Sequence, residues 1–405
     1  MTDLDVRPCA DLAEFDRAVG AIGQYFGMEP DAERAERFSR VLPVERMHAA
    51  WEDGEIVGGA GAFPFAMSVP GGLVDCAGTT VVGVAPTHRR RGVLRAMMRA
   101  HLDDAHERDE PIAALWASEE TIYGRFGYGV AAYAGDVTIP REHVDYAVPR
   151  ERAGRIRIVE QDEALEKFPA LWEGLARTRP GLFIRSPAWW ELRALADPPD
   201  RRGGAGPKRF ALLEIDGEPK GYAVYRHKME WREGVSSGEV RVVEAIAPEP
   251  AALAEVWRYL LDVDWIAGIT SSLVPPDHPL FFVLAKARRM RYRMGDGLWV
   301  RLVDVGAALS RRTYPEDGEL VLDVRDAFCP WNEGRWHLAD GVAARTDASA
   351  DLALDASTLG SAYLGGIRLA QLAQGGLVEE LRAGAIERAD GLFRHGLHPW
   401  CPEIF

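Results

Sequence analysis

The stretch VVGVAPTHRRRGVLRAMM, from Val81 to Met98, decides how the rest of the chain is interpreted. Its apolar opening favours a β-strand, and Pro86 ends that strand because proline has no N–H to give to a sheet. Three arginines and Gly92 follow, and then apolar residues recur at helical spacing. The stretch therefore predicts a strand, a basic glycine loop and an amphipathic helix.

This order of elements is typical of an anion-binding site. The first N–H groups of a helix have no partners within it, so they can bond phosphate oxygens under a favourable dipole. A glycine lets the backbone approach the anion closely, and arginines add charge. The stretch has neither the GxxxxGK[ST] pattern of a P-loop nor the GxGxxG pattern of a Rossmann fold. An ordinary βα turn with solvated arginines is the alternative that this motif alone leaves open.

The composition indicates an ordinary soluble globular protein. A chain of 405 residues suggests two or three domains, and 47% of them are hydrophobic. No run approaches the ~18 apolar residues of a membrane span, and the acidic N-terminus does not resemble a signal peptide. Four cysteines lie without CxxC spacing, which argues against a metal site. Scattered cysteines also favour a reducing compartment, so we expect a cytoplasmic protein.

The formal net charge of −14 bears on the partner. It disfavours nucleic acid, because a phosphate backbone needs clustered cations. It favours cationic partners such as polyamines, aminoglycosides or lysine side chains. Solubility is another reason for an acidic composition, and charge alone does not decide between the two.

The order of predicted elements indicates an α+β fold with an internal duplication. In the first part, strands at Ile112–Trp116 and Ala131–Ile139 follow the basic loop and its helix. Later in the chain, EAIAP at residues 244–248 echoes VGVAP at residues 82–86, but apolar residues replace the arginines and Gly92. We therefore expect a second copy that has lost the anion site. Two unrelated strand–proline–helix units are the alternative. From about Asp304 short strands and helices form a third part.

A second motif, LWASEETIYGRFGYG, runs from Leu115 to Gly129. With the basic loop it resembles the GNAT acetyltransferases, whose acetyl-CoA loop follows the pattern Q/R-x-x-G-x-G/A. Leu94 departs from that pattern because it replaces the last small residue. Over its whole length the chain resembles the Eis (enhanced intracellular survival) family. The resemblance rests on THRRRG, on SE–IYGRFGYG and on an end at Phe405.

The resemblance implies three domains. Residues 1–147 would form a catalytic GNAT domain, residues 148–300 a degenerate GNAT-like domain, and residues 301–405 a sterol-carrier-protein-like domain. It also implies acetyl-CoA as co-substrate, and primary amines of polycationic compounds such as aminoglycosides as acceptors. A homohexamer follows from the same resemblance.

The resemblance also implies the cofactor contacts. The strand edge would pair with the pantetheine amides, the basic loop would hold the pyrophosphate, and the start of the second motif would line the thioester. The residues concerned are Val82, Gly83, Val84, Arg90, Arg91, Gly92, Val93, Leu94, Arg95, Ser118 and Glu119.

Acetyl transfer requires a base for the amine and a proton for the departing thiolate. Tyr123 is the candidate acid, because it aligns with the family's proton-donating tyrosine and its ordinary pKa of ~10 keeps it protonated. Tyr128 is the competing choice, although we expect Phe126 and Tyr128 in the core. No cysteine lies in either motif, which favours direct transfer over a thiol intermediate.

The base is less evident from the residues. His88 lies in the loop, and His101 lies on the packing face of the helix. The resemblance implies that the base is the carboxylate of the C-terminal residue, here Phe405. The candidates for holding the amine are Glu29, Asp31 and Glu403.

Two alternatives to an aminoglycoside acetyltransferase stay open. The acceptor could be a protein lysine or a small arylalkylamine. A protein of another class, an acyl-CoA- or lipid-binding carrier or sensor, would use the C-terminal domain as the carrier. The two intact motifs favour catalysis.

Overall fold

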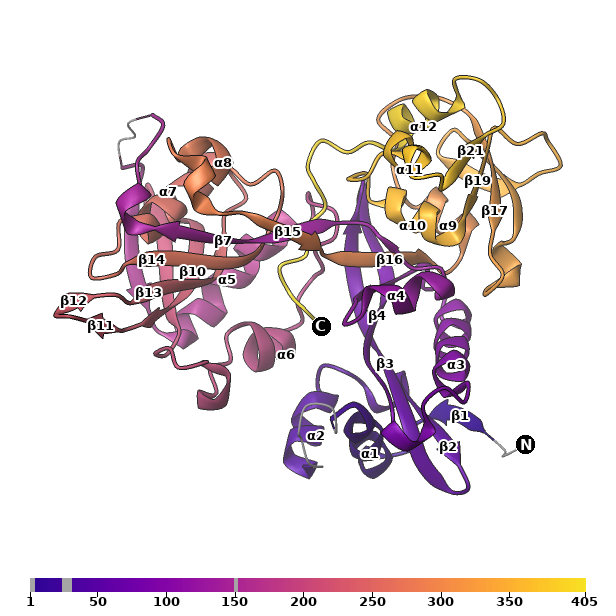
Figure 1. Cartoon of the computed structure of the whole chain (residues 1–405), viewed down its shortest axis with the longest axis horizontal. Helices are drawn as coiled ribbons and strands as arrows, with labels where there is room; N and C mark the ends of the chain where they lie inside the picture. The colour runs from indigo at the N-terminus through magenta and orange to yellow at the C-terminus, as the bar shows by residue number, and fades with distance from the viewer. Residues whose placement is uncertain (1–3, 24–30, 149–151) are drawn as a thin grey trace. The chain divides into compact units, whose positions relative to one another are not determined.

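The computed structural model describes residues 4–23, 31–148 and 152–405 (Figure 1). Contacts divide the chain into two compact units. The first comprises residues 1–132, 298–396 and 404–405, and the second comprises residues 133–297 and 397–403. Within the described residues, no helix combines the length and the apolar character that crossing a membrane requires.

A seven-stranded sheet forms the centre of the first unit. Its strands lie in the order β1 (Asp5–Pro8), β2 (Met47–Glu52), β3 (Glu55–Val69), β4 (Gly72–Val84), β5 (Ile112–Trp116), β16 (Leu298–Leu302) and β6 (Gly129–Val130). β4 and β5 run parallel, and the other neighbours run antiparallel. The predicted basic loop therefore follows the central strand of this sheet.

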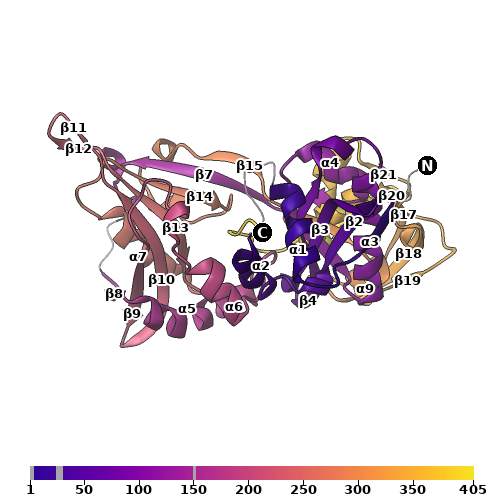
Figure 2. The ribbon, with the colours of Figure 1, turned by 90° about the horizontal axis from the view of Figure 1, so that it is seen from below.

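Helices cover both faces of this sheet, as two adjacent glycines of β3 show. Adjacent residues of a strand point to opposite faces. A Cβ at Gly58 would lie 2.9 Å from Met97 in α3 (Val93–Glu107). A Cβ at Gly59 would lie 2.4 Å from a carbonyl oxygen of α1 (Leu12–Gly23). The two helices therefore pack on opposite faces and close to the backbone, as Figure 2 shows.

The second unit repeats this sheet strand for strand. Its order is β8 (Arg155–Val159), β9 (Arg209–Ile215), β10 (Glu218–Lys228), β13 (Glu239–Ile246), β14 (Gly268–Val274), β7 (Tyr133–Pro140) and β15 (Arg293–Asp296). The fourth and fifth strands again run parallel. The shared order supports the predicted internal duplication.

The two sheets exchange their sixth strands. β16 pairs with β5 although it follows the strands of the second unit, and β7 pairs with β14 although it follows β6 in the chain. The sequence assigned the strand at Ala131–Ile139 to the first domain, whereas in the structure β7, from Tyr133 on, pairs within the second sheet. Strand pairing over such separations depends on long-range contacts that a local pattern does not encode. The domain boundaries after residues 147 and 300 stay a prediction.

The third part of the chain contributes a five-stranded sheet to the first unit. Its strands lie in the order β19 (Val342–Arg345), β18 (Gly334–Ala339), β17 (Leu320–Arg325), β20 (Leu352–Asp355) and β21 (Val378–Glu380). Its helices are α9 (Val305–Ser310), α10 (Ala356–Tyr363), α11 (Leu369–Gln374) and α12 (Ala385–Phe393). The remaining named elements are α2 (Ala32–Ser39), α4 (Glu120–Tyr123), α5 (Gln161–Ala176), α6 (Pro187–Trp189), α7 (Pro250–Leu261), α8 (Leu280–Val283), β11 (Trp231–Arg232) and β12 (Val235–Ser236).

A buried ion pair fixes the second motif to the third part of the chain. Arg301 in β16 donates to Asp326 at 2.5 Å and to the carbonyl of Phe126 at 2.6 Å. Both charged side chains are almost completely buried. Asp326 also accepts hydrogen bonds from two backbone N–H groups and from Asn332. A Cβ at Gly127 would lie 1.5 Å from the Arg301 guanidinium, so this position of the motif requires glycine.

We predict that Arg301→Met destabilises the fold strongly, because it leaves the Asp326 carboxylate buried without a cation. Such a loss costs about 3–5 kcal/mol. The matched control is Arg325→Met, which breaks an ion pair of 2.9 Å with Asp355 whose side chains are more than half exposed. An exposed pair contributes about 0–1 kcal/mol. Denaturant unfolding measures both, and equal losses would contradict the central role of Arg301.

Candidate functional site

The two parallel strands at the centre of the first sheet separate part-way along their length. β4 pairs with β5 only from Cys76 to Gly78, opposite Ile112 to Ala114, although β4 continues to Val84. The other edge of β5 pairs with β16 along its whole length. In the described sheet, β4 therefore carries no ladder with β5 beyond Gly78. We call this separation the first parting.

A β-bulge marks β4 within the first parting. The register of β4 against β3 shifts between Gly59 and Gly61, so that Val81 and Val82 both lie opposite Ala60. Val81 takes a φ of 53°, which a β-branched residue rarely adopts. Strained backbone of this kind clusters at binding and catalytic sites, so the bulge marks a functional strand. No pattern in the sequence predicts this bulge, because valine is an ordinary residue in a strand.

The basic loop leads from the first parting into α3. Gly92 precedes the helix with a φ of 90° and no side-chain cap, so the first-turn N–H groups remain available to an anion. A Cβ at Gly92 would meet nothing within 4 Å, so the space over the helix start is open. Arg90 also takes a positive φ, of 63°, and its side chain is exposed. These features fit the phosphates of a nucleotide cofactor.

Glu52, which the sequence did not point to, holds the loop in place. This carboxylate is buried at the end of β2. It accepts a hydrogen bond of 2.8 Å from Arg91 and lies 3.1 Å from His88 Nε2. Arg91 therefore orients the loop in this structure rather than reaching into solvent. Only the pairing of β2 with β3 brings Glu52 near the loop, and the sequence does not encode that proximity.

Arg95 contacts the third part of the chain. Its guanidinium lies 5.2 Å from the ring centroid of Phe328, and that of Arg99 lies 4.1 Å from the same ring. Cation–π contacts at such distances are favourable. The sequence did not point to this ring as a partner of the two arginines. The stripe itself packs as predicted, with Met97, Met98, His101 and Leu102 buried.

Tyr123 lies buried at the end of α4, and its neighbour in space is Ser118. Burial raises the pKa of Tyr123 above its ordinary value, while a hydrogen bond with Ser118 acts against that rise. The phenol therefore stays protonated at neutral pH. Ser118 and Glu119 are exposed just before α4. The structure thus brings together the candidate acid and a residue predicted to line the thioester.

Tyr128 is committed to the core. Its hydroxyl lies 2.9 Å from Thr79 Oγ1, which in turn lies 2.7 Å from His101 Nε2. Burial raises the pKa of Tyr128 and lowers that of His101 to about 3. The ring of Tyr128 packs edge-on against Tyr123 at 6.2 Å. The ring of Tyr128 therefore packs against that of the candidate acid, and its own hydroxyl already has Thr79 as a hydrogen-bond partner.

The ring of Phe405 packs against β3 at the level of the first parting. It lies edge-on to Phe65 at 4.9 Å and to Phe63 at 6.4 Å between centroids. Phe63 pairs across the strands with Gly78, where β4 and β5 make their last pair. Only 9% of Phe405 is exposed. The C-terminal residue is therefore packed at a defined place in the first unit.

The three candidates for holding the amine differ in where the structure places them. Asp31 caps α2 by accepting from the N–H groups of Glu33 and Arg34. Glu403 is half-buried in the second unit, where it pairs with Arg185 and accepts a hydrogen bond from Trp189. Its prediction as an amine ligand is wrong, because its carboxylate is already paired. Glu29 lies outside the described residues.

The predicted cofactor residues occupy one continuous path. Val82, Val84 and Leu94 are half-buried, whereas Gly83 and Val93 are buried. A Cβ at Gly83 would lie 2.5 Å from Ile22, so glycine at this position allows α1 to pack closely on the face of the sheet. The residues of the path that are exposed are Arg90, Arg91, Gly92, Arg95, Ser118 and Glu119.

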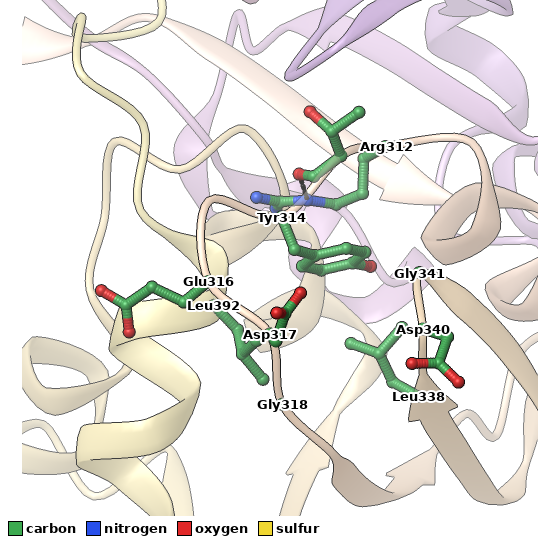
Figure 3. Close-up of a pocket in the computed structure, with 10 residues that line it drawn as sticks. Arg312, Tyr314, Glu316, Asp317, Gly318, Leu338, Asp340, Gly341 and Leu392 are labelled. Atoms are coloured by element: carbon green, nitrogen blue, oxygen red, sulfur yellow. Dashed lines mark hydrogen bonds between the residues drawn. The ribbon is translucent and has the colours of Figure 1, made fainter.

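The third part of the chain contains a cavity of about 390 Å³ (Figure 3). Carboxylates of Glu316, Asp317 and Asp340 line it beside Leu338 and Leu392. A lipid carrier needs a mainly apolar lining, because buried polar groups without partners are costly. This charged lining does not favour a lipid.

Family models match three parts of the chain. Two models described as acetyltransferase (GNAT) domain match residues 5–131 and 181–302. A model described as sterol carrier protein domain matches residues 305–402. The predicted α+β fold of two tandem GNAT domains and a sterol-carrier-protein-like domain is thereby confirmed.

Relatives named as N-acetyltransferases cover most of the chain. A protein named as an N-acetyltransferase in Streptomyces avermitilis is 42% identical over 96% of both chains. The N-acetyltransferase Eis of Mycobacterium tuberculosis is 35% identical over 84% of this chain and 83% of its own. The crystal structure of Eis1 from Mycobacterium abscessus matches with a TM-score of 0.87 and 32% identity, covering 99% of this chain and 100% of that one.

Proposed function

The chain belongs to the Eis family of GNAT N-acetyltransferases, and from this premise we propose that it acetylates primary amines of polycationic substrates such as aminoglycosides, with acetyl-CoA as donor. The observation that carries the proposal is the first parting, which leads directly into the open start of α3. A strand edge beside free helix N–H groups offers partners to the amides and to the phosphates of one extended cofactor.

We propose that the cofactor lies along the path from β4 to α3. Backbone groups of Val82 and Val84 would pair with the pantetheine amides. Arg90 and the first-turn N–H groups of Val93 and Leu94 would bind the pyrophosphate. Arg91 and Arg95 add positive charge near the phosphates but make contacts of their own with Glu52 and Phe328, so we assign them a smaller share of the binding.

The proposed reaction is a direct transfer. The carboxylate of Phe405 takes a proton from the substrate ammonium, and the free amine attacks the thioester carbonyl. A C–N bond forms, the C–S bond breaks, and Tyr123 donates its proton to the departing thiolate. The second proton, which the nitrogen loses as it becomes an amide, restores the phenol of Tyr123, and the carboxylate of Phe405 releases the first proton to water. Two observations support these roles: the raised pKa of Tyr123 keeps it protonated, and Phe405 packs at the level of the first parting. Acid–base catalysis of this kind contributes about 10²- to 10⁴-fold.

The net charge supports a cationic acceptor. A charge of −14 raises the local concentration of polycations around the chain. A protein lysine or a small arylalkylamine is the second candidate acceptor, because it offers the same primary amine. The rival assignment as a lipid carrier loses support from the charged lining of the cavity in the third part.

Two further proposals concern the setting of the enzyme. The family resemblance supports a homohexamer. The four cysteines are buried and scattered along the chain, which supports a reducing compartment such as the cytoplasm.

We predict that Tyr123→Phe lowers kcat by about 10²-fold or more with little change in KM, because only the proton donor is lost. Thiol release from acetyl-CoA measures this with an aminoglycoside, a polyamine and a lysine peptide as acceptors. The wild-type chain should turn over the aminoglycoside with the highest kcat/KM.

The matched control is Tyr128→Phe, which removes a hydroxyl held by Thr79 and should change kcat by only a few-fold. If the larger loss falls on Tyr128→Phe, the assignment of the acid is wrong. Thiol release with none of the three acceptors would overturn the proposed function.

We predict that activity also depends on the carboxylate of Phe405. An α-carboxylate has an ordinary pKa of ~3.5, so it is ionised at neutral pH and can accept a proton. Deleting Phe405 moves the carboxylate about 3.5 Å, the length of one residue. Appending residues after Phe405 turns it into a neutral amide. Both changes should remove most of kcat while the affinity for acetyl-CoA stays unchanged in calorimetry.

An N-terminal extension of the same length is the control and should leave kcat intact. Full turnover by the chain with a C-terminal extension would exclude the terminal carboxylate as base. An internal Asp or Glu acting through water would then be the candidate.

A further inference from the structure

The second sheet repeats the parting of the first. β13 pairs in parallel with β14 only from Glu239 to Val242, although β13 continues to Ile246. The register of β13 against β10 shifts so that Val243 is the extra residue. In the echo of residues 82–86 by residues 244–248, Val243 corresponds to Val81 and Glu244 to Val82. We call this separation the second parting.

A charged cluster surrounds Glu244, which lies on β13 beyond the last pair with β14. Arg185 donates to both carboxylate oxygens of Glu244, at 2.5 and 3.1 Å, and Tyr222 donates to the same carboxylate at 2.8 Å. The guanidinium lies 3.4 Å from the ring centroid of Trp172 and 4.5 Å from that of Trp190. Glu244 therefore takes the place that Val82 has in the first sheet. Its carboxylate is bonded by Arg185 and Tyr222, which belong to the same unit.

The tail segment, Leu397–Glu403, reaches the same cluster. Glu403 forms an ion pair with Arg185 and accepts a hydrogen bond of 2.5 Å from Trp189. Arg185 thus stands between two carboxylates, one on β13 and one on the tail. The guanidinium can serve both because it is a planar fork, with separate edges for separate acceptors.

Trp400 fixes the tail segment to the other side of the second parting. Its indole N–H donates to the carbonyl of Leu273 in β14 at 2.6 Å. Its backbone N–H donates to the carbonyl of Pro180 at 2.9 Å. A Cβ at Gly181 would lie 2.9 Å from the carbonyl oxygen of Trp400, so the tail passes close to the backbone there. The tail segment is therefore bonded through Arg185 to β13 and directly to β14.

We propose that the second parting has exchanged an acyl-CoA for the chain's own tail segment, and that Arg185 and Glu244 are positioning residues for acetyl transfer, acting through Glu403. The role in transfer rests on the proposed function, in which Phe405 is the base. Glu403 precedes Phe405 by two residues, so fixing Glu403 confines residue 405 to within about 7 Å of it. This restraint adds to the packing of the Phe405 ring against Phe65, and a chain end without such restraints is usually mobile.

Two conservative substitutions test the proposal in the full-length chain. Arg185→Lys keeps the charge but loses the fork, and Glu403→Gln keeps the shape but loses the charge. The first readout is amide hydrogen exchange of the tail segment, which should accelerate by about 10-fold or more in each variant. The second is thiol release, in which kcat should fall by about 10-fold with KM for acetyl-CoA unchanged.

The matched control is Arg157→Lys. Arg157 also pairs with two carboxylates of the second unit, Glu163 at 2.6 Å and Glu214 at 2.9 Å. Neither of these partners belongs to the tail segment. This variant should change neither tail exchange nor kcat. A comparable change of tail exchange or kcat in Arg157→Lys would mean that losing any guanidinium between two carboxylates loosens the second unit. That result would overturn the proposal.

The two readouts separate failure of the inference from failure of the proposed function. Unchanged tail exchange in Arg185→Lys and Glu403→Gln overturns the inference, whatever the activity. Accelerated exchange with unchanged kcat overturns the positioning role, while acetyl transfer stands. If the wild-type chain acetylates no amine, the proposed function and the positioning role fail, and exchange still decides whether the second parting holds the tail.

Discussion

Beyond Gly78, β4 leaves β5, and the arrangement of the site follows from that parting. A strand edge has N–H and C=O groups that need partners, and an edge inside a sheet is not a stable end state unless something supplies them. β5 does not supply them, because its ladder with β4 ends at the pair of Gly78 and Ala114. The bulge at Val81 adds strain at the same place. A ligand with amide groups can pair with the edge groups, which is why the first parting suits the pantetheine arm of acetyl-CoA.

The second sheet meets the same constraint in a different way. Its strands part after Val242, two positions further along than the end of the first ladder at Gly78, and its bulge lies at the residue that corresponds to Val81, Val243. There the chain supplies one partner itself, because the indole N–H of Trp400 donates to the carbonyl of Leu273 in β14, while Arg185 holds the side chain of Glu244 on β13. A buried ion pair requires that each charge keep a partner, so this arrangement leaves little freedom for an exchangeable ligand. One duplicated scaffold thus accounts for a cofactor path in one copy and a tail anchor in the other.

The sequence predicted the parts of the site that are local. The strand ending at Pro86, the glycine at the start of α3 and the apolar stripe of that helix depend on residues within about twenty positions of one another, and the structure has them. The parts that it missed depend on distant pairing. Glu52 reaches the loop only through the sheet, Asp326 meets Arg301 across 25 residues, and the exchange of β7 and β16 joins strands far apart in the chain. Glu403 was misassigned for the same reason, since its partner lies more than two hundred residues away.

Calorimetric titration of acetyl-CoA into the full-length chain tests the central claim most directly. If only the first parting leads to an open helix start, one molecule should bind per chain. Gly92→Glu should abolish binding, because it puts a carboxylate where the phosphates belong. Gly92→Ala imposes the same positive φ on a side chain, a cost of about 1–2 kcal/mol, but adds no charge and should retain binding. Two binding sites per chain, or one site that survives Gly92→Glu, would contradict the account.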